Sequence, residues 1–226
     1  MKLRSKRYKE SEKKIDKAKT YQLKEAISLL KAMSPVKFDS SVDLHFHLSV
    51  DTKKSDQMVR GTVILPHGTG KKVRVAVFCK GEHERIALGA NADFVGGLEL
   101  IDKVAGGFLD FDCAIATPEM MKDLSKLGKV LGPRGLMPSP KTGTVTNDIL
   151  KAIEDVKRGK VEFRVDKQGG VHLAVGKLSF SEDKLYDNAL KVIEALNDSK
   201  PASVKGKFIR SLSIATSMNP GLALAV

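Results

Sequence analysis

The sequence predicts an α+β protein: a discontinuous two-layer split α/β domain that carries an inserted three-layer, Rossmann-like α/β domain. Two observations support this prediction. Residues 1–68 and 159–226 contain runs in which apolar and polar residues alternate, as in a sheet with one buried face. Residues 69–158 instead alternate short apolar runs with helical segments, a pattern typical of parallel strands joined by helices. We therefore expect residues 1–68 with 159–226 to form one domain and residues 69–158 the other.

The first discontinuous segment begins with a basic arm, because residues 1–19 contain nine Lys and Arg but three acidic residues. Apolar residues at helical spacing then predict a helix that ends before Pro35. These residues are Leu23, Ala26, Ile27, Leu30 and Met33. Strict alternation over residues 42–50 predicts a strand. His45 and His47 share its polar face, but no third ligand accompanies them, so we interpret them as solvated residues rather than a metal site.

A loop at residues 65–70 separates this segment from the insert, and a second connection follows the helix that carries Ile153 and Val156. Two adjacent single-chain connections between two domains are typical of a hinge. The residues that we predict to form this hinge are Pro66, His67, Gly68 and Gly159.

The second discontinuous segment returns to the alternating pattern. Residues 161–166 and 171–173 flank Gln168-Gly169-Gly170, which predicts a hairpin with a glycine turn. Ser181 begins a helix that extends to Leu196, and a last strand covers about 207–216. The apolar tail at 222–226 has no assigned role.

The charge of the chain indicates a polyanionic partner. The formal net charge is +12 and the pI is about 9.6. Residues 1–68 hold 15 basic and 8 acidic residues, residues 159–226 hold 10 and 7, and the insert holds 14 and 12. Most of the excess therefore lies on the discontinuous domain, which we expect to bind nucleic acid.

Several other classes receive little support. Cys79 and Cys113 are too far apart in sequence to suggest a disulfide framework or a zinc site, and we expect a cytoplasmic protein with no membrane span, metal or cofactor. The segment His67–Lys71 lacks the first glycine and the hydroxyl of a phosphate loop. An RNA-recognition sheet needs exposed aromatics, whereas Phe46 and Phe163 fall on core-facing positions. An α/β enzyme with the Gly-rich stretch 128–145 as its phosphate site stays as the alternative.

That Gly-rich stretch also carries a resemblance to a known family. The run Leu127-Gly128-Lys129-Val130-Leu131-Gly132-Pro133-Arg134-Gly135-Leu136-Met137-Pro138 resembles the diagnostic segment of the bacterial L-one family of ribosomal proteins. Its motif residues are Gly132, Pro133, Arg134, Gly135 and Pro138. Residues 55–63, 65–68, 94–97 and 111–118 resemble the same family, so the likeness covers almost the whole chain.

The resemblance implies a non-enzymatic protein of the large ribosomal subunit. Its implied partners are large-subunit rRNA at the mobile stalk beside the E site, E-site tRNA, whose release it assists, and its own operon mRNA, whose translation it represses. It further implies a ribosome-associated, cytoplasmic protein that is a monomer when free.

The RNA contacts that the resemblance implies lie on the discontinuous domain. They are Lys37, Phe38, Ser40, Ser41, Lys53, Lys54, Arg164, Asp166, Lys167, Gly169, His172, Ser211, Thr216, Ser217, Met218 and Asn219. Lys and Arg can bind phosphates, and hydroxyls such as those of Ser40 and Thr216 can pair with ribose 2′-hydroxyls. The family commonly has Thr-Met-Gly where this chain has Ser217-Met218-Asn219, and we expect Asn219 to tolerate a positive φ.

Overall fold

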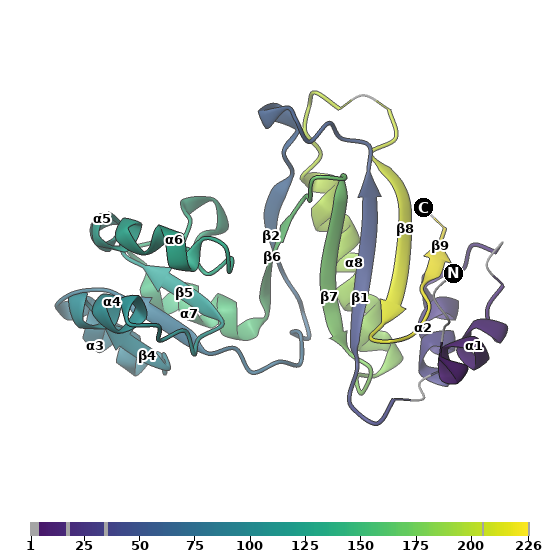
Figure 1. Ribbon diagram of the computed structural model, residues 1–226, viewed down its shortest axis with the longest axis horizontal. Helices are drawn as coiled ribbons and strands as arrows, with labels where there is room; N and C mark the ends of the chain where they lie inside the picture. The colour runs from purple at the N-terminus through teal and green to yellow at the C-terminus, as the bar shows by residue number, and fades with distance from the viewer. Residues whose placement is uncertain (1–4, 17–18, 34–35, 205, 226) are drawn as a thin grey trace. The chain divides into compact units, whose positions relative to one another are not determined.

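The computed structural model describes residues 5–16, 19–33, 36–204 and 206–225, which form two compact units (Figure 1). Unit 1 combines the chain up to residue 70 with the chain from residue 161, and unit 2 is residues 71–160. The insert thus begins and ends two residues later than the range 69–158. Lys2, Arg4 and Lys17 of the basic arm, and Pro35, lie outside the described residues.

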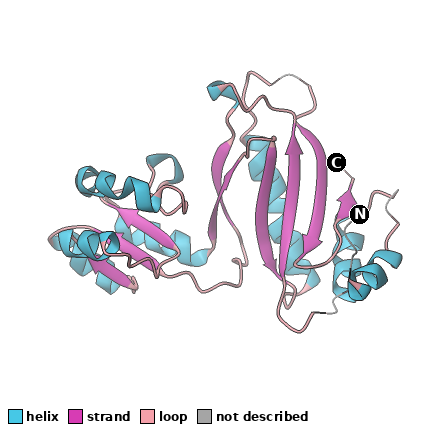
Figure 2. Cartoon of the chain, viewed as in Figure 1, coloured by secondary structure: helices cyan, strands magenta, loops and turns pink. Residues whose placement is uncertain are grey.

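Unit 1 is built on a four-stranded antiparallel sheet with the strand order β7-β1-β8-β9. The strands are β1 (Ser41–Leu48), β7 (Gly170–Lys177), β8 (Ile209–Thr216) and β9 (Leu222–Leu224). Helices α2 (Leu23–Ala32) and α8 (Glu182–Asp198) pack together and against one face of this sheet (Figure 2). The resulting two-layer arrangement confirms the α+β prediction.

The core of unit 1 explains why the strands alternate. Every second residue of β1 is buried, including Leu44 and Phe46, and these meet the buried helix residues Ile27 and Leu185 in one hydrophobic cluster. Burying a side chain of this size contributes roughly 1.5–3 kcal/mol. The same burial confirms that Phe46 and Phe163 face the core.

Four elements of unit 1 were not predicted from the sequence. The basic arm includes helix α1 (Lys6–Lys13), whose first turn is capped by the Ser5 hydroxyl accepting from the Tyr8 N–H. Strand β2 (Arg60–Ile64) follows a short 3₁₀ turn, η1 (Ser55–Gln57). The apolar tail forms β9, and the buried Leu222 and Leu224 account for its composition.

The predicted hairpin at residues 161–173 is wrong. Strand β6 (Lys160–Arg164) pairs with β2 in a separate two-stranded sheet, whereas β7 pairs with β1. Only the turn is as predicted, since the Asp166 N–H donates to the Gly170 carbonyl over 2.8 Å. The chain therefore changes sheet at this turn, which alternation within each strand does not reveal.

Unit 2 has a parallel sheet with the order β4-β3-β5. Its strands are β3 (Val75–Phe78), β4 (Phe94–Gly96) and β5 (Cys113–Ala116). Its helical segments are α3 (Glu82–Gly89), α4 (Leu98–Ala105), η2 (Pro118–Met120), α5 (Met121–Leu124), η3 (Ser125–Leu127), α6 (Gly128–Leu131), η4 (Pro140–Thr142) and α7 (Ile149–Arg158). One face of the sheet packs on Ile101 and Leu124, and the other on Ala87 and Ile153. Both faces are covered, which gives the three layers that the sequence predicts.

Candidate nucleic-acid interface

Among the described residues, no helix covers the second face of the four-stranded sheet of unit 1, and the polar side chains on that face line a hollow. We call this surface the open face; it consists of Asp43, His45, His47, Gly170, His172, Ser211 and Ser213. The register places His45 opposite both His172 and Ser213, and His47 opposite Gly170 and Ser211. The hollow has a volume of about 320 Å³, and its lining includes the three histidines and the two serines.

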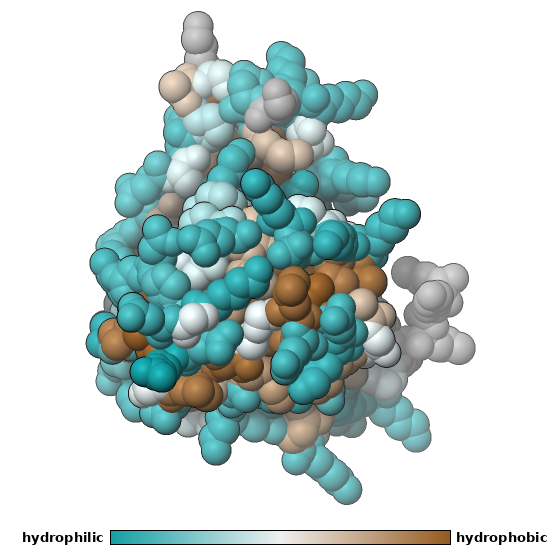
Figure 3. All heavy atoms as spheres, turned by 90° about the vertical axis from the view of Figure 1, so that its left-hand side faces the viewer, coloured by the Kyte–Doolittle hydropathy of each residue, from teal (hydrophilic) through white to brown (hydrophobic). Residues whose placement is uncertain are grey.

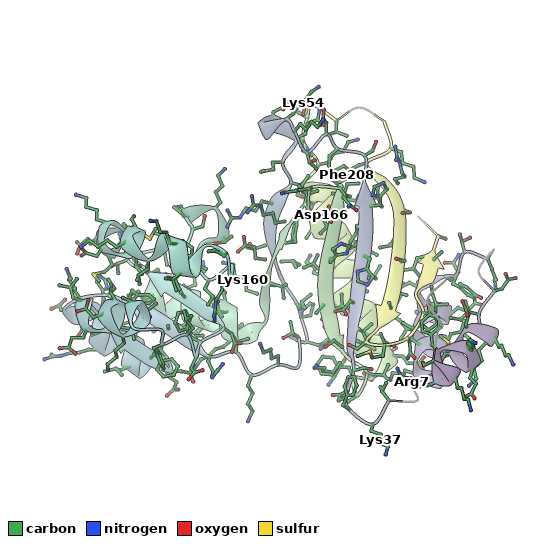
Figure 4. The ribbon with its side chains drawn as sticks, viewed as in Figure 1. Arg7, Lys37, Lys54, Lys160, Asp166 and Phe208 are labelled. Atoms are coloured by element: carbon green, nitrogen blue, oxygen red, sulfur yellow. The ribbon has the colours of Figure 1, made fainter. Side chains whose placement is uncertain are left out.

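Three exposed lysines gather at one end of the open face, which we call the lysine end: Lys53, Lys54 and Lys167. The Thr52 hydroxyl donates to the Lys167 carbonyl over 2.9 Å, which ties the loop after β1 to the turn before β7. Figure 4 shows Lys54 and Asp166 at this end of the sheet, while Lys37 lies at the other. The predicted contacts at Lys53, Lys54 and Lys167 are therefore brought together by two loops that are distant in sequence.

Asp166 shapes the turn that presents Lys167. Its Oδ1 accepts from the N–H groups of Gln168 (2.8 Å) and Gly170 (2.6 Å). These backbone hydrogen bonds, first that of Gly170, hold the pKa of the Asp166 carboxyl below its usual range. Gly169 adopts a φ of 82°, and its carbonyl accepts from the Leu48 N–H. Asp166 and Gly169 therefore hold the shape of the lysine end, and direct contacts of these two residues with RNA stay predictions.

The opposite end of the open face, which we call the Phe38 end, combines exposed apolar and polar side chains. It consists of Lys37, Phe38, Ser41, Ser217, Met218 and Asn219. Phe38 is 53% exposed and Met218 65% exposed, although both are large and apolar. The Ser217 N–H donates to the Ser41 carbonyl over 3.1 Å, so the loop after β8 is fixed beside the start of β1. Exposed apolar surface beside a cation suits stacking against a nucleic-acid base.

Three details at the Phe38 end differ from the sequence expectation. The positive φ falls on Met218, at 69°, and not on Asn219. Ser40 is 0% exposed, and its hydroxyl has no hydrogen-bond partner among the described residues. Thr216 is 3% exposed, and its hydroxyl accepts from the Asn219 Nδ2 over 2.8 Å. Both hydroxyls are buried in the free protein, and their contacts with RNA stay predictions.

Of the remaining predicted contacts, Arg164 and Ser211 are exposed, as is His172. His172 forms a pair with His45 that was not predicted from the sequence. Its Nδ1 lies 3.0 Å from the Nδ1 of His45, with the rings edge to face. Burial and the neighbouring His172 lower the pKa of His45, while Asp43 acts in the opposite direction. Spacing along one strand indicates only that His47 shares a face with His45. The contact with His172 depends on the register between two distant strands, which spacing does not reveal.

The Gly-rich motif forms a shaped loop in unit 2. A Cβ on Gly132 would lie 2.5 Å from the Gly128 carbonyl oxygen, and Gly135 adopts a φ of 71°. Pro138 is buried, whereas Pro133 and Arg134 are exposed. The loop therefore presents Arg134 on a backbone that only glycine permits at two positions. Elsewhere in unit 2, burial raises the pKa of the Cys79 thiol to about 11, so this cysteine is not an activated nucleophile.

Two of the four predicted hinge residues, His67 and Gly68, are attached to helix α8. The Asn188 side chain accepts from the His67 N–H and donates to the carbonyls of Gly68 and Val175. The His67 ring also lies 3.2 Å from Asp187. Gly159 ends helix α7 with a φ of 108°. Pro66, His67 and Gly68 are therefore held on unit 1, while motion at the connections stays a prediction.

Features of other protein classes are absent from the described part of the chain. No helix there is long and apolar enough to cross a membrane. The described residues also contain no group of three or more His, Cys, Asp or Glu placed to hold a metal ion. Figure 3 shows a mainly hydrophilic surface with a few hydrophobic side chains between the polar ones.

Comparison with known proteins agrees with the motif and the fold. A family model described as "Ribosomal protein L1p/L10e family" matches residues 30–220. A protein of Fervidobacterium nodosum, named large ribosomal subunit protein uL1, is 55% identical over 97% of this chain and 94% of its own length. Proteins of the same name from Protochlamydia amoebophila and Thermobifida fusca are 52% and 50% identical, each over 97% of this chain and 93% of its own length. The chain therefore belongs to the ribosomal protein L1p/L10e family.

Proposed function

We propose that the chain is a structural protein of the large ribosomal subunit, and not an enzyme, and that it binds rRNA along the open face of unit 1. One observation carries this proposal. A sheet face without covering helices lies between two ends that both present exposed cations, Lys53, Lys54 and Lys167 at one and Lys37 at the other. Such a surface complements a folded polyanion.

The dimensions of the open face suit a segment of folded RNA. Strand β1 has eight residues, so the two ends lie roughly 25 Å apart along it. An RNA backbone of several nucleotides can then span the face, with phosphates at the cations of both ends and ribose groups over the serines between them. Phe38 and Met218 offer a place for one unstacked base. The proposal thus assigns positioning to the lysines and RNA selectivity to the hydroxyl and apolar contacts.

The finer roles extend this proposal. In the family that the motif resembles, the rRNA site is the mobile stalk beside the E site, and the same RNA surface binds the operon mRNA. We therefore propose that rRNA and mRNA compete for the open face, and that free protein represses its own translation. Assistance to tRNA release is proposed for unit 2, where Arg134 stands exposed on the Gly-rich loop.

Movement of unit 2 would accompany the role at the stalk. Because Asn188 anchors the chain as far as Gly68, and Gly70 lies close to Lys177 and Phe180, we place the first flexible connection after Gly70. The second is at Gly159, whose left-handed conformation ends α7. Lys71 and Lys72 are exposed at the first connection, which leaves room for a change in backbone angle.

The test is binding of the full chain to a stalk rRNA fragment and to an unrelated duplex, over about 0.1 to 0.5 M salt. We expect the stalk fragment to bind at least about 1000-fold more tightly, and to keep this lead as salt weakens phosphate contacts. Equal affinities that fall together with salt would overturn the proposal, because only the positive charge would then be responsible for binding.

A further inference from the structure

We propose that His45 and His172 form a phosphate-binding site at the middle of the open face, and that this site takes up a proton when an RNA backbone binds. The inference rests on the proposed function and adds a proton to it. Its starting point is the composition of the hollow, whose nine lining residues include no Lys or Arg. A phosphate that crosses this hollow can meet a positive charge there only on histidine.

The geometry of the pair limits its protonation in the free protein. The two Nδ1 atoms lie 3.0 Å apart, which is hydrogen-bond distance. In such a contact one nitrogen donates its proton and the other accepts with a lone pair, so the two Nδ1 atoms share a single proton. If both rings were fully protonated, two N–H groups would face each other and the contact would be repulsive. The free pair is therefore held below full charge.

A bound phosphate would instead favour the pair with a proton on each Nδ1. A non-bridging oxygen between the rings accepts a hydrogen bond from each Nδ1, which requires a proton on both. Small side-chain rotations open the space, because the hollow above the pair is unfilled by protein and Ser213 opposite His45 is small. The bound state thus contains at least part of a proton more than the free state.

The charged groups around the pair are few and divided in sign. On β1, Asp43 and His47 flank His45, and on β7, Lys177 lies within electrostatic range of Asp43. The Asp166 Oδ2 lies 3.7 Å from the Nε2 of His172. Strand β8 contributes Ser211 and Ser213 to the face and the exposed Arg210 near its start. Asp166 is directed at the Nε2 side of His172, so the Nδ1 side remains for a ligand.

These contacts determine how the affinity for RNA should depend on pH. Burial and the neighbouring imidazole lower the pKa of His45 in the free protein, and a bound phosphate would raise it. Between the free and bound values, binding takes up a proton and affinity increases as pH falls. At a pH below the pKa of His45 in the free protein, the residue is charged both with and without RNA, and affinity no longer depends on pH.

The experiment measures the affinity of the full chain for the stalk rRNA fragment at about pH 8, 7 and 6, at constant ionic strength. We expect binding to strengthen by about 5- to 10-fold over this range. His45→Gln and His172→Gln should each remove most of that gain, so that the affinity of each variant at about pH 6 stays close to its own affinity at about pH 8. The matched control is His67→Gln, since His67 contacts Asp187 on α8 and is not among the residues that line the hollow.

Calorimetry of the unaltered protein in buffers of different ionisation enthalpy gives a second readout that does not depend on variants. It should detect net proton uptake at about pH 7. The same pH gain in His45→Gln as in the unaltered protein, or zero proton uptake, would overturn the phosphate site while leaving RNA recognition intact. Failure to prefer the stalk fragment at any pH would instead overturn the proposed function.

Discussion

The sheets of the two units differ in how many of their faces are covered by helices. In unit 2 all four residues of β3 are buried, because helices cover both faces of its parallel sheet. In unit 1 the residues of β1 are alternately buried and partly exposed, because helices α2 and α8 cover one face. A sheet covered on both sides is a scaffold, whereas a sheet covered on one side is also a surface. Unit 1 therefore has a sheet face available to a macromolecule, whereas both faces of the unit 2 sheet are occupied by helices.

The two units also differ in the ion pairs that their Lys and Arg side chains form. In unit 2, Lys71 and Arg74 pair with Asp112, and Lys80 and Lys126 pair with Asp123. In unit 1, the lysines of the two ends form no ion pair among the described residues: Lys37, Lys53, Lys54 and Lys167. Other cations of unit 1, such as Lys19 and Arg60, are paired with Glu25 and Glu162, so the lysines of the two ends are the ones left available for a partner.

Charge reversal at the lysine end should have the largest effect. We expect the triple change Lys53→Glu, Lys54→Glu and Lys167→Glu to weaken stalk RNA binding by at least about 100-fold, because three phosphate contacts become repulsive. The dependence of log affinity on log salt should also become shallower by roughly two to three units. Filter binding or fluorescence anisotropy across a salt series measures both quantities.

The matched control for charge reversal lies in unit 2. The change Lys129→Glu, Arg134→Glu and Lys141→Glu alters the net charge of the chain equally, on exposed residues. We expect it to weaken the same RNA by less than about fivefold. Comparable losses in the two variants would show that total charge, rather than the open face, determines binding, and the contrast between the units would fail.

Removal of the exposed ring at the Phe38 end should have an intermediate effect. We expect Phe38→Ala to weaken stalk RNA binding by about tenfold, because one stacked base loses its platform. The melting temperature should hardly change, since the ring is largely solvent-exposed in the free protein. Leu190→Ala, which removes an exposed side chain from α8, should change neither quantity. A fall in melting temperature with unchanged affinity would make Phe38 a packing residue instead.

How far the sequence predicts this surface depends on the range of each interaction. Local periodicity correctly predicted β1 and α8, because burial of alternate or i, i+4 residues leaves a direct pattern. It missed β2, whose five residues do not alternate regularly, and it mispaired β6 with β7. Strand partners are set by contacts between distant residues, which no single segment encodes.

The candidate site shows the same division. The exposure of Lys53, Lys54 and Lys167 follows from their type and their loops. The burial of Ser40 and Thr216 does not, because small hydroxyl residues occur both in cores and on surfaces. His45 and His172 are 127 residues apart in sequence, and their contact depends on the register of β1 and β7. Residue chemistry was therefore predictable, whereas the pairing of residues across strands required the structure.

The smallest expected effect compares two carboxylates, one in each unit. Hydrogen bonds from backbone N–H groups lower the pKa of Asp166, whereas the Lys71 side chain is the main cause of the lowered pKa of Asp112. In both cases the folded protein favours the ionised form. The stabilisation is therefore present above the ordinary Asp pKa of about 3.9 and is lost as pH falls through the lower folded value.

Salt should separate these two carboxylates. We expect Asp166→Asn and Asp112→Asn each to lower the melting temperature by about 1–3 °C near pH 7. At a pH below the folded pKa of each carboxyl, the same changes should leave the melting temperature unaltered. Added salt screens the exposed Lys71 more than it weakens fixed backbone donors, so about 0.5 M salt should reduce the effect at Asp112 but not at Asp166. Asp56→Asn, at an exposed residue, is the control and should leave the melting curve unchanged. Equal salt sensitivity at Asp166 and Asp112 would mean that the turn of unit 1 depends on nearby cations such as Lys167, and the lysine end would then lose its rigid support.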